Sequence, residues 1–182
     1  DLLFGAEEHN HSHDHNHDAD PHFWLSPENA KIMARNICTG LTAQYPQYSD
    51  IFSSNLESLT EKLNELEIYG MQNLSALSCR ELVTFHDGFS YFASAFDLTI
   101  LRAVEEDSGS EASAAELKEL ISLVEAHALP AVFTEINGSK SSARTICTET
   151  GAALFTLDMA ISGGSYFDAM YHNINTLWEA LQ

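Results

Sequence analysis

A run of alternating histidines near the start of the chain is the first feature that could do chemistry. Asn, Ser and Asp separate its five imidazoles: His9, His11, His13, His15 and His17. Imidazole is the commonest metal ligand among protein side chains, and zinc favours nitrogen donors of this kind. No apolar side chain lies within the run, so we predict a disordered loop that collects metal ions. An expression tag is the alternative, but tags are usually uninterrupted runs at a terminus, whereas this run is internal and interleaved.

Further along the chain, two histidines and a carboxylate could make a tighter site. His22 follows Asp20-Pro21, whereas His86 and Asp158 each come directly after a short apolar run. Two imidazoles and one carboxylate form an N/N/O ligand set that suits zinc or manganese. From the residues alone, a lone histidine after a strand is more often a hydrogen-bonded structural residue, so both interpretations stay open.

Four apolar runs alternate with helical patterns in the second half of the chain. The runs cover residues 82–85, 98–101, 131–134 and 153–157. Continuous apolar strands separated by amphipathic helices are typical of parallel βαβ units. We therefore predict a three-layer α/β domain over residues 80–182, with a four-stranded parallel sheet and helices on both faces. Ligands of such sheets bind at the carboxyl ends of the strands, where His86, Glu135 and Asp158 are expected.

Two helices are predicted ahead of this domain, within residues 21–79. The first begins at Ser26, a favourable N-cap, with Pro27 at the first helical position, and it ends before Pro46. The second covers about residues 49–77. At about 40 Å it would be long enough to cross a whole domain.

Charge and cysteine usage narrow the range of functions. A formal charge of −19, from 27 acidic and 8 basic residues, argues against nucleic acid and anionic membranes as partners, because phosphate is neutralised by Lys and Arg. No run of apolar residues is long enough for a transmembrane helix. Cys38, Cys79 and Cys147 form no CxxC pair, so we expect buried free thiols, although one disulfide is sterically allowed. The opening residues DLLFGAEE carry no targeting signal from which to read a localisation.

Several other candidate residues have plainer interpretations. His127, near a helix end, and His172, on the last helix, are predicted to lie at the surface. Trp24 could shield a metal, but a tryptophan at the entry to a helix more often packs in a core. The acidic segment 105–111 is predicted to be a solvated loop. Three aspartates in and after the histidine run have two open interpretations. They either add carboxylate ligands or only keep the run soluble: Asp14, Asp18 and Asp20.

Five blocks of sequence, taken in order, resemble the metal-binding receptors of bacterial ABC importers. They are DPHFWLSPENA, TFHDGFSYFA, EASAAELKELI, AVFTEINGSKSSARTICTETGA and TLDMAISGGSYFDAMYHNINTL. The closest group is the zinc receptors of the ZnuA type, which carry a His- and Asp-rich loop just before the first block. The resemblance covers nearly the whole chain. It implies that His22 and His86 are zinc ligands, that Asp158 occupies the family's carboxylate position, and that Glu135 orients a histidine from behind.

The resemblance also implies a domain organisation. In that family a long rigid helix joins two α/β lobes, and the metal lies between them. Because DLLFGAEE resembles the end of the amino-terminal lobe, we expect a fragment that lacks most of that lobe and the histidine it contributes. Residues 1–20 would then hold the end of that lobe and the His-rich loop. Residues 21–79 would hold the connecting helices, and residues 80–182 the carboxy-terminal metal-binding lobe.

The function implied by the resemblance is capture of Zn²⁺, or alternatively Mn²⁺, outside the cytoplasmic membrane and its delivery to an ABC permease. We expect a monomeric periplasmic or membrane-anchored protein that catalyses no reaction and binds no nucleic acid. A zinc hydrolase is one alternative, because two histidines and a carboxylate with an open position also occur in catalytic sites. Neither HExxH nor G-x-S-x-G is present to support it. A zinc buffer or adhesion protein without a transporter is a third reading.

Overall fold

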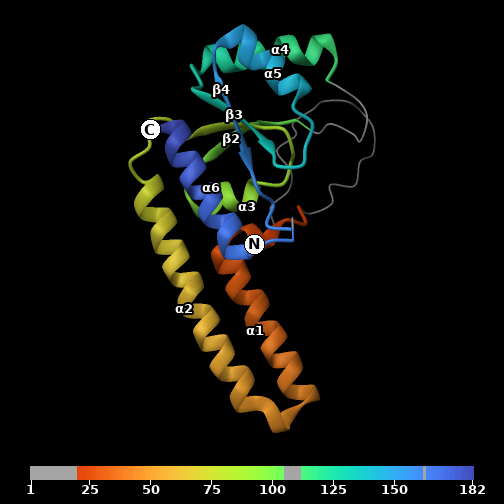
Figure 1. The fold of residues 1–182 in the computed structure, drawn as a ribbon, viewed down its shortest axis with the longest axis vertical. Helices are drawn as coiled ribbons and strands as arrows, with labels where there is room; N and C mark the ends of the chain where they lie inside the picture. Colours follow the sequence, from red (N-terminus) through yellow and green to blue (C-terminus); the bar gives the residue numbers. More distant parts are fainter. Residues whose placement is uncertain (1–19, 105–111, 162) are drawn as a thin grey trace.

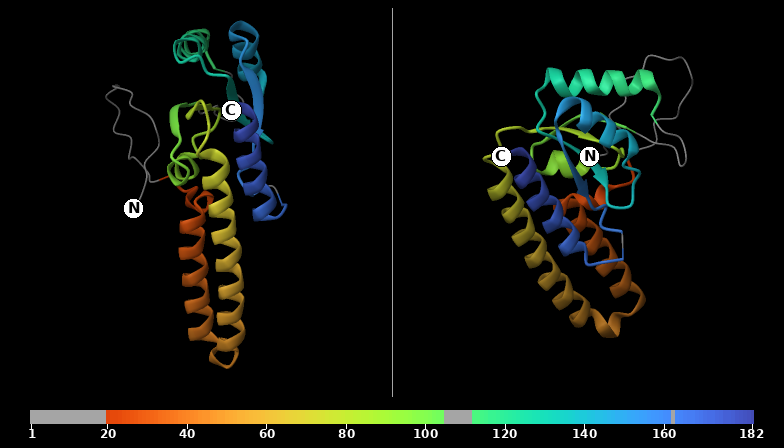
Figure 2. Two further views of the ribbon diagram at one scale, coloured as in Figure 1. Left: turned by 90° about the vertical axis from the view of Figure 1, so that its left-hand side faces the viewer. Right: turned by 45° about the horizontal axis from the view of Figure 1, so that its top comes forward.

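The computed structural model describes residues 20–104, 112–161 and 163–182. A sheet lies toward one end of the molecule, and a helical hairpin projects from it (Figures 1 and 2). The strands are β1 (Glu81–Thr84), β2 (Thr99–Ala103), β3 (Ala131–Glu135) and β4 (Ala153–Leu157). Their order is β2-β1-β3-β4, and all pairs of neighbours run parallel. The predicted four-stranded parallel sheet is confirmed.

The two faces of the sheet pack against different helices. One face carries α4 (Ala114–Ala126) and α5 (Ser141–Thr150), and the other carries α3 (Ser90–Ala95) and α6 (Tyr166–Leu181) (Figure 1). Successive side chains of a strand point to opposite faces. Leu82 and Phe133 therefore enter the core shared with α3 and α6, whereas Val83 and Val132 enter the core shared with α4 and α5. This alternation produces the predicted three-layer domain.

The projecting hairpin consists of α1 (Pro27–Gln44) and α2 (Ser49–Leu74), joined by the short helix η2 (Pro46–Tyr48). The Ser26 side chain accepts a hydrogen bond from the Asn29 backbone N–H at 3.3 Å, which caps α1 as its sequence predicts. The 26 residues of α2 span about 39 Å. This helix ends at Leu74 rather than at residue 77, because the Arg80 guanidinium donates to the Leu74 carbonyl at 2.7 Å while the chain turns toward β1.

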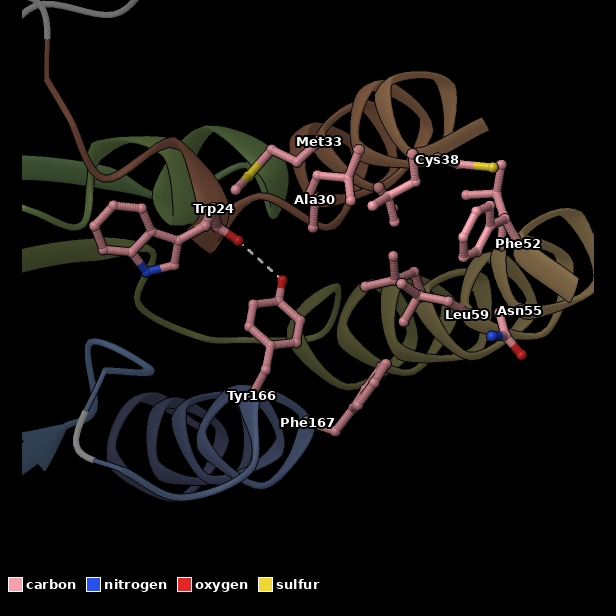
Figure 3. A pocket seen from close by; sticks show the side chains of 14 residues that line it. Trp24, Ala30, Met33, Cys38, Phe52, Asn55, Leu59, Tyr166 and Phe167 are labelled. Carbon is pink, nitrogen blue, oxygen red and sulfur yellow. Dashed lines mark hydrogen bonds between the residues drawn. The ribbon is translucent and has the colours of Figure 1, made fainter. Parts of the chain in front are cut away.

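An apolar groove of about 400 Å³ lies along the hairpin (Figure 3). Met33 of α1 and Phe52 and Leu59 of α2 line it, and Trp24 and Tyr166 lie toward one end. The narrow apolar stripe of α2 faces this groove, and its opposite side faces water, as the spacing predicts. The groove shows that the two helices alone do not fill the space between their apolar faces.

The three cysteines are free but only half-buried, so the expected thiol state is confirmed and the expected full burial is wrong. Each lies at a margin of the packing: Cys38 lines the groove, and Cys79 and Cys147 rest against the edges of the two cores. Partial burial raises the pKa of the Cys147 thiol. In the described ranges, no helix combines the length and the apolar content that crossing a membrane requires.

Candidate metal centre

His22 lies in a tight turn just before the short helix η1 (Phe23–Leu25). Asp20 Oδ1 accepts a hydrogen bond from the His22 backbone N–H at 2.9 Å and lies 2.8 Å from His22 Nδ1. The Asp20 side chain is only 2% exposed. Such an Asx turn, in which a short carboxylate closes on the chain two residues later, fixes both the backbone and the ring of His22. Because a carboxylate oxygen can only accept, Nδ1 carries the proton and Nε2 keeps its lone pair.

His86 stands at the carboxyl end of β1, one residue beyond Phe85. Its Nδ1 lies 3.1 Å from Oε1 of Glu135, the last residue of the neighbouring strand β3. A Cβ added at Gly88 would lie only 2.6 Å from His86 Cδ2 and 2.8 Å from its Nε2, so the missing side chain makes room for the ring. The carboxylate of Glu135 selects the same tautomer as Asp20 does, and Nε2 is again the free acceptor.

The two imidazoles meet through these Nε2 atoms, which are 3.3 Å apart. Their ring centroids are separated by 5.0 Å, and the rings are nearly perpendicular. Two lone pairs at this distance repel unless a proton or a cation lies between them. Zinc binds imidazole nitrogen at about 2.0–2.1 Å, so two nitrogens at a tetrahedral angle are about 3.3–3.4 Å apart. The observed separation fits the edge of a zinc tetrahedron.

Asp158 follows β4 directly, as the sequence predicts, but its backbone and side chain serve a turn. Its Oδ1 accepts from the Ala160 N–H at 2.8 Å, and Asn173 binds its backbone N–H and carbonyl, each at 2.7 Å. Within residues 20–104, 112–161 and 163–182, no group of three or more His, Cys, Asp and Glu side chains could hold one metal ion. The described site is thus a pair of histidines, each backed by a carboxylate, and ligation by Asp158 stays a prediction.

The remaining histidines of the described ranges lie away from this pair. His127 is exposed, with its Nδ1 2.8 Å from Glu81 Oε2, and Glu81 begins β1, so this pair marks the opposite end of the sheet. His172 is exposed and its Nε2 lies 3.0 Å from the Thr156 carbonyl oxygen. Their predicted surface positions are confirmed. The tract His9, His11, His13, His15 and His17 and the segment 105–111 lie outside the described residues.

Two neighbours of His22 have roles that sequence reasoning missed or left open. Asp20 was expected to be a ligand or only a solubilising charge, yet its contact is with Nδ1, the nitrogen that faces away from His86. The spacing Asp-Pro-His, which suits an Asx turn, was the available signal. Trp24 packs against the core, as one of its two interpretations expects, and its ring meets the His22 ring edge-on at 5.4 Å. Shielding of a metal by Trp24 stays a prediction.

Comparison with known proteins identifies the family of the chain. Residues 2–180 match the model of the family described as "ZnuA: Zinc-uptake complex component A periplasmic". The chain belongs to this family. Among solved structures, the crystal structure of ZnuA is similar with a TM-score of 0.80 and 31% identity over 89% of this chain and 62% of that one. A zinc-bound ZnuA deletion mutant reaches a TM-score of 0.84 at 28% identity, covering 100% of this chain and 66% of its own.

Curated relatives of this ZnuA-family chain include metal-binding proteins of two kinds. The "Zinc-binding lipoprotein AdcA" of Streptococcus pneumoniae is 31% identical over 181 residues, which cover 95% of this chain and 35% of the relative. The manganese ABC transporter substrate-binding lipoprotein PsaA of Streptococcus mitis is 27% identical over 171 residues, covering 89% of this chain and 55% of its own length. The chain therefore spans about a third to a half of these relatives. The predicted family membership is confirmed.

Proposed function

We propose that the protein captures zinc outside the cytoplasmic membrane and delivers it to an ABC-type importer. The observation that carries the proposal is the His22–His86 pair, with its Nε2 atoms 3.3 Å apart and a carboxylate behind each ring. A carboxylate that accepts from Nδ1–H fixes the tautomer and makes Nε2 a better donor to a metal. The relatives' names, which include zinc- and manganese-binding lipoproteins, support the same cargo and an extracytoplasmic location.

In this proposal zinc is bound between two parts of the chain. His22 comes from the turn before the connecting helices, residues 21–79, and His86 comes from the sheet of residues 80–182. Asp158 follows β4, two strands away from β1, and its Oδ1 accepts from the Ala160 N–H in the structure. We propose that its carboxylate turns toward the two histidines when zinc binds, and that a group outside the described residues completes the tetrahedron. Manganese is the alternative cargo, because carboxylate oxygen also suits it. The tract His9, His11, His13, His15 and His17 acts as an auxiliary collector that raises the local zinc concentration.

A receptor is favoured over a zinc hydrolase by the position of Glu135. Glu135, the carboxylate that the sequence offers as a general base, contacts His86 Nδ1, on the side of the ring away from the metal-facing Nε2. It therefore orients the ring and does not reach a metal-bound water. We propose that the protein is not an enzyme, that it acts as a monomer and that, with a charge of −19, it does not bind nucleic acid. Hydrolysis of generic esters that requires both zinc and Glu135 would reverse this choice.

The first experiment measures zinc binding by competition with a chelator. All variants are made in a parent chain in which Asn replaces the five tract histidines, so that the measured zinc affinity is that of the His22–His86 site alone. Replacing His22 or His86 by Ala is expected to weaken zinc binding by more than about 100-fold, beyond the loss typical of an outer-sphere partner. His127→Ala is the matched control, since this histidine also pairs with a carboxylate. Unchanged zinc affinity in His22→Ala and His86→Ala would refute the site.

The second experiment separates import from buffering or adhesion. Cells that carry the double substitution His22→Ala and His86→Ala in the full-length protein are expected to accumulate less radioactive zinc at low external zinc. The defect should disappear when zinc is supplied in excess. Cells with His127→Ala should import zinc normally. Normal uptake by the double variant, together with lost zinc binding in vitro, would favour a buffer or adhesion protein without a transporter.

A further inference from the structure

The turn that carries His22 is hydrogen-bonded to the loop that carries Asp158. The Trp24 indole Nε1–H donates to the Met159 carbonyl at 2.9 Å, across a sequence separation of 135 residues. Met159 follows Asp158 and is 4% exposed, so this acceptor lies on a packed segment. Leu25, the next residue of η1, is fully buried in the core below the sheet. The position of His22 is therefore determined on one side by apolar packing and on the other by a hydrogen bond.

Tyr166 makes a second tie to the same turn. Its hydroxyl donates to the Trp24 carbonyl oxygen at 2.9 Å (Figure 3). This carbonyl lies in η1, where a short helix leaves acceptors without partners of its own, so the tyrosine satisfies an otherwise unpaired group. Burial raises the pKa of Tyr166, which keeps the phenol protonated and able to donate. Tyr166 is the first residue of α6, so the tie joins η1 directly to a long, well-packed helix.

The same helix also clamps the loop of Asp158. Asn173, about two helical turns after Tyr166, is fully buried and binds both backbone groups of Asp158 at 2.7 Å. The contacts form a closed ring: Tyr166 to Trp24, Trp24 to Met159, and Asp158 to Asn173 on the same helix. The ring fixes the spacing between the turn of His22 and the loop of Asp158. Ala160, two residues after Asp158, has a left-handed backbone conformation with φ 58, and its N–H donates to Asp158 Oδ1 at 2.8 Å.

We propose that Tyr166 is a positioning residue for His22. Its hydroxyl holds the η1 turn at the distance from the β4–α6 loop at which the His22 ring meets His86. The effect on metal binding rests on the function proposed above, whereas the effect on the His22 ring is a property of the metal-free protein. If the hydroxyl is removed, the turn samples other positions, and zinc affinity falls by the fraction of time that the two rings are apart.

The test is Tyr166→Phe, which keeps the aromatic ring and its packing and removes only the hydroxyl. Tyr69 of α2 provides a matched control. Its hydroxyl donates to Asn175 of α6 at 2.6 Å, so Tyr69→Phe removes one tyrosine hydrogen bond that involves α6 without touching η1. Both variants are made in the chain whose five tract histidines are Asn, and thermal unfolding is measured for both. Zinc affinity is expected to fall about three- to tenfold in Tyr166→Phe, as the loss of one hydrogen bond predicts, and to stay unchanged in Tyr69→Phe.

A metal-free readout keeps the inference separate from the proposed function. Nuclear Overhauser contacts between the His22 and His86 rings, 5.0 Å apart by their centroids, are measured without zinc. They are expected to weaken in Tyr166→Phe and to persist in Tyr69→Phe. If the ring contacts persist in Tyr166→Phe, the positioning role is refuted, whether or not the parent binds zinc. If the contacts weaken but the parent chain binds no zinc, the positioning role stands and the proposed function fails. Equal losses of zinc affinity in both variants would show a general effect of stability and would also overturn the inference.

Discussion

The two ends of the sheet carry histidine–carboxylate pairs of nearly the same geometry but with different surroundings. At the carboxyl end, Nδ1 of His22 and of His86 lie 2.8 and 3.1 Å from their carboxylate oxygens. At the amino end, His127 Nδ1 lies 2.8 Å from Glu81. The difference is that the first two rings face one another through Nε2, whereas His127 meets no second histidine in the described ranges. A carboxylate behind a histidine orients a ring; a metal site also requires that oriented rings converge.

This comparison predicts a large difference in response to pH. Protons compete with zinc for Nε2 of His22 and His86, so zinc affinity should fall as the pH is lowered from 7.5 to 5.5. The fall can reach about tenfold per pH unit for each histidine that must lose a proton before it binds zinc. Calorimetric titration at the two pH values measures it. His127→Ala should leave the pH dependence unchanged, and equal affinity at both pH values would exclude histidine ligation.

The next largest effect on zinc affinity is expected from the carboxylates that accept from the histidine Nδ1 atoms. Glu135→Ala removes the acceptor behind His86 and is expected to weaken zinc binding by about 10- to 100-fold, the usual cost of losing such a partner. Glu81→Ala removes the equivalent acceptor behind His127 and should leave zinc affinity unchanged. Competition with a chelator measures both. A similar loss in the two variants would mean that charge alone, and not the orientation of the His86 ring, governs the affinity.

A smaller effect is expected when the ring of His86 is pushed from its place. Gly88→Ala puts a methyl group 2.5 Å from Met159 Cε and 2.6 Å from His86 Cδ2, both closer than van der Waals contact allows. Overpacking costs about 1–3 kcal/mol, and about tenfold weaker zinc binding follows if most of that strain moves the ring. Gly40→Ala is the control, because a Cβ there has nothing within 4 Å and only improves the propensity of α1. If Gly88→Ala binds zinc normally, Met159 has moved instead of the ring.

Sequence reasoning predicts the sheet well because its signal is local. Each strand is an apolar run bounded by turn residues, and parallel order follows from the alternation with helices. His86, Glu135 and Asp158 are found at strand ends for the same reason. The long helix is also evident from its stripe, but its end at Leu74 depends on Arg80, which joins the Leu74 carbonyl to the carbonyls of Phe96 and Asp97. Helix ends set by such contacts do not appear in a periodic pattern.

The site is predictable only in part because its decisive distance is not local. His22 and His86 are 64 residues apart in sequence, and their 3.3 Å approach depends on how η1 rests on the sheet. The residues alone leave joint ligation by these two histidines open, and the resemblance to zinc receptors implies it. The bond from Trp24 to Met159 spans a still longer separation, and no spacing rule predicts a tryptophan with a backbone acceptor there. Asp20 is different: its turn is local, so the missed assignment was available from the sequence.

The smallest effect on zinc is expected from a charge cluster on the hairpin. Lys31 of α1 is 8% exposed, and its Nζ lies 2.7 Å from Glu28 and 2.9 Å from Glu67 of α2. Burial disfavours the ammonium ion, but the hydrogen bonds to these carboxylates outweigh it, and the pKa of Lys31 is raised. Lys31→Met should therefore lower the free energy of unfolding by about 1–2 kcal/mol at pH 7 and leave zinc affinity unchanged.

The pH dependence of this last effect has a definite sign. A raised pKa in the folded state means that the stabilisation is fully present below the unfolded pKa of lysine, about 10.4, and is lost as the pH rises through the folded value. The stability difference between the parent and Lys31→Met, measured by urea unfolding, should therefore be constant from pH 7 to 9 and shrink above about pH 10.5. If Lys31→Met instead weakens zinc binding, the position of α1 influences the position of His22. The approach of the His22 and His86 rings would then depend on the hairpin as well as on the carboxyl end of the sheet.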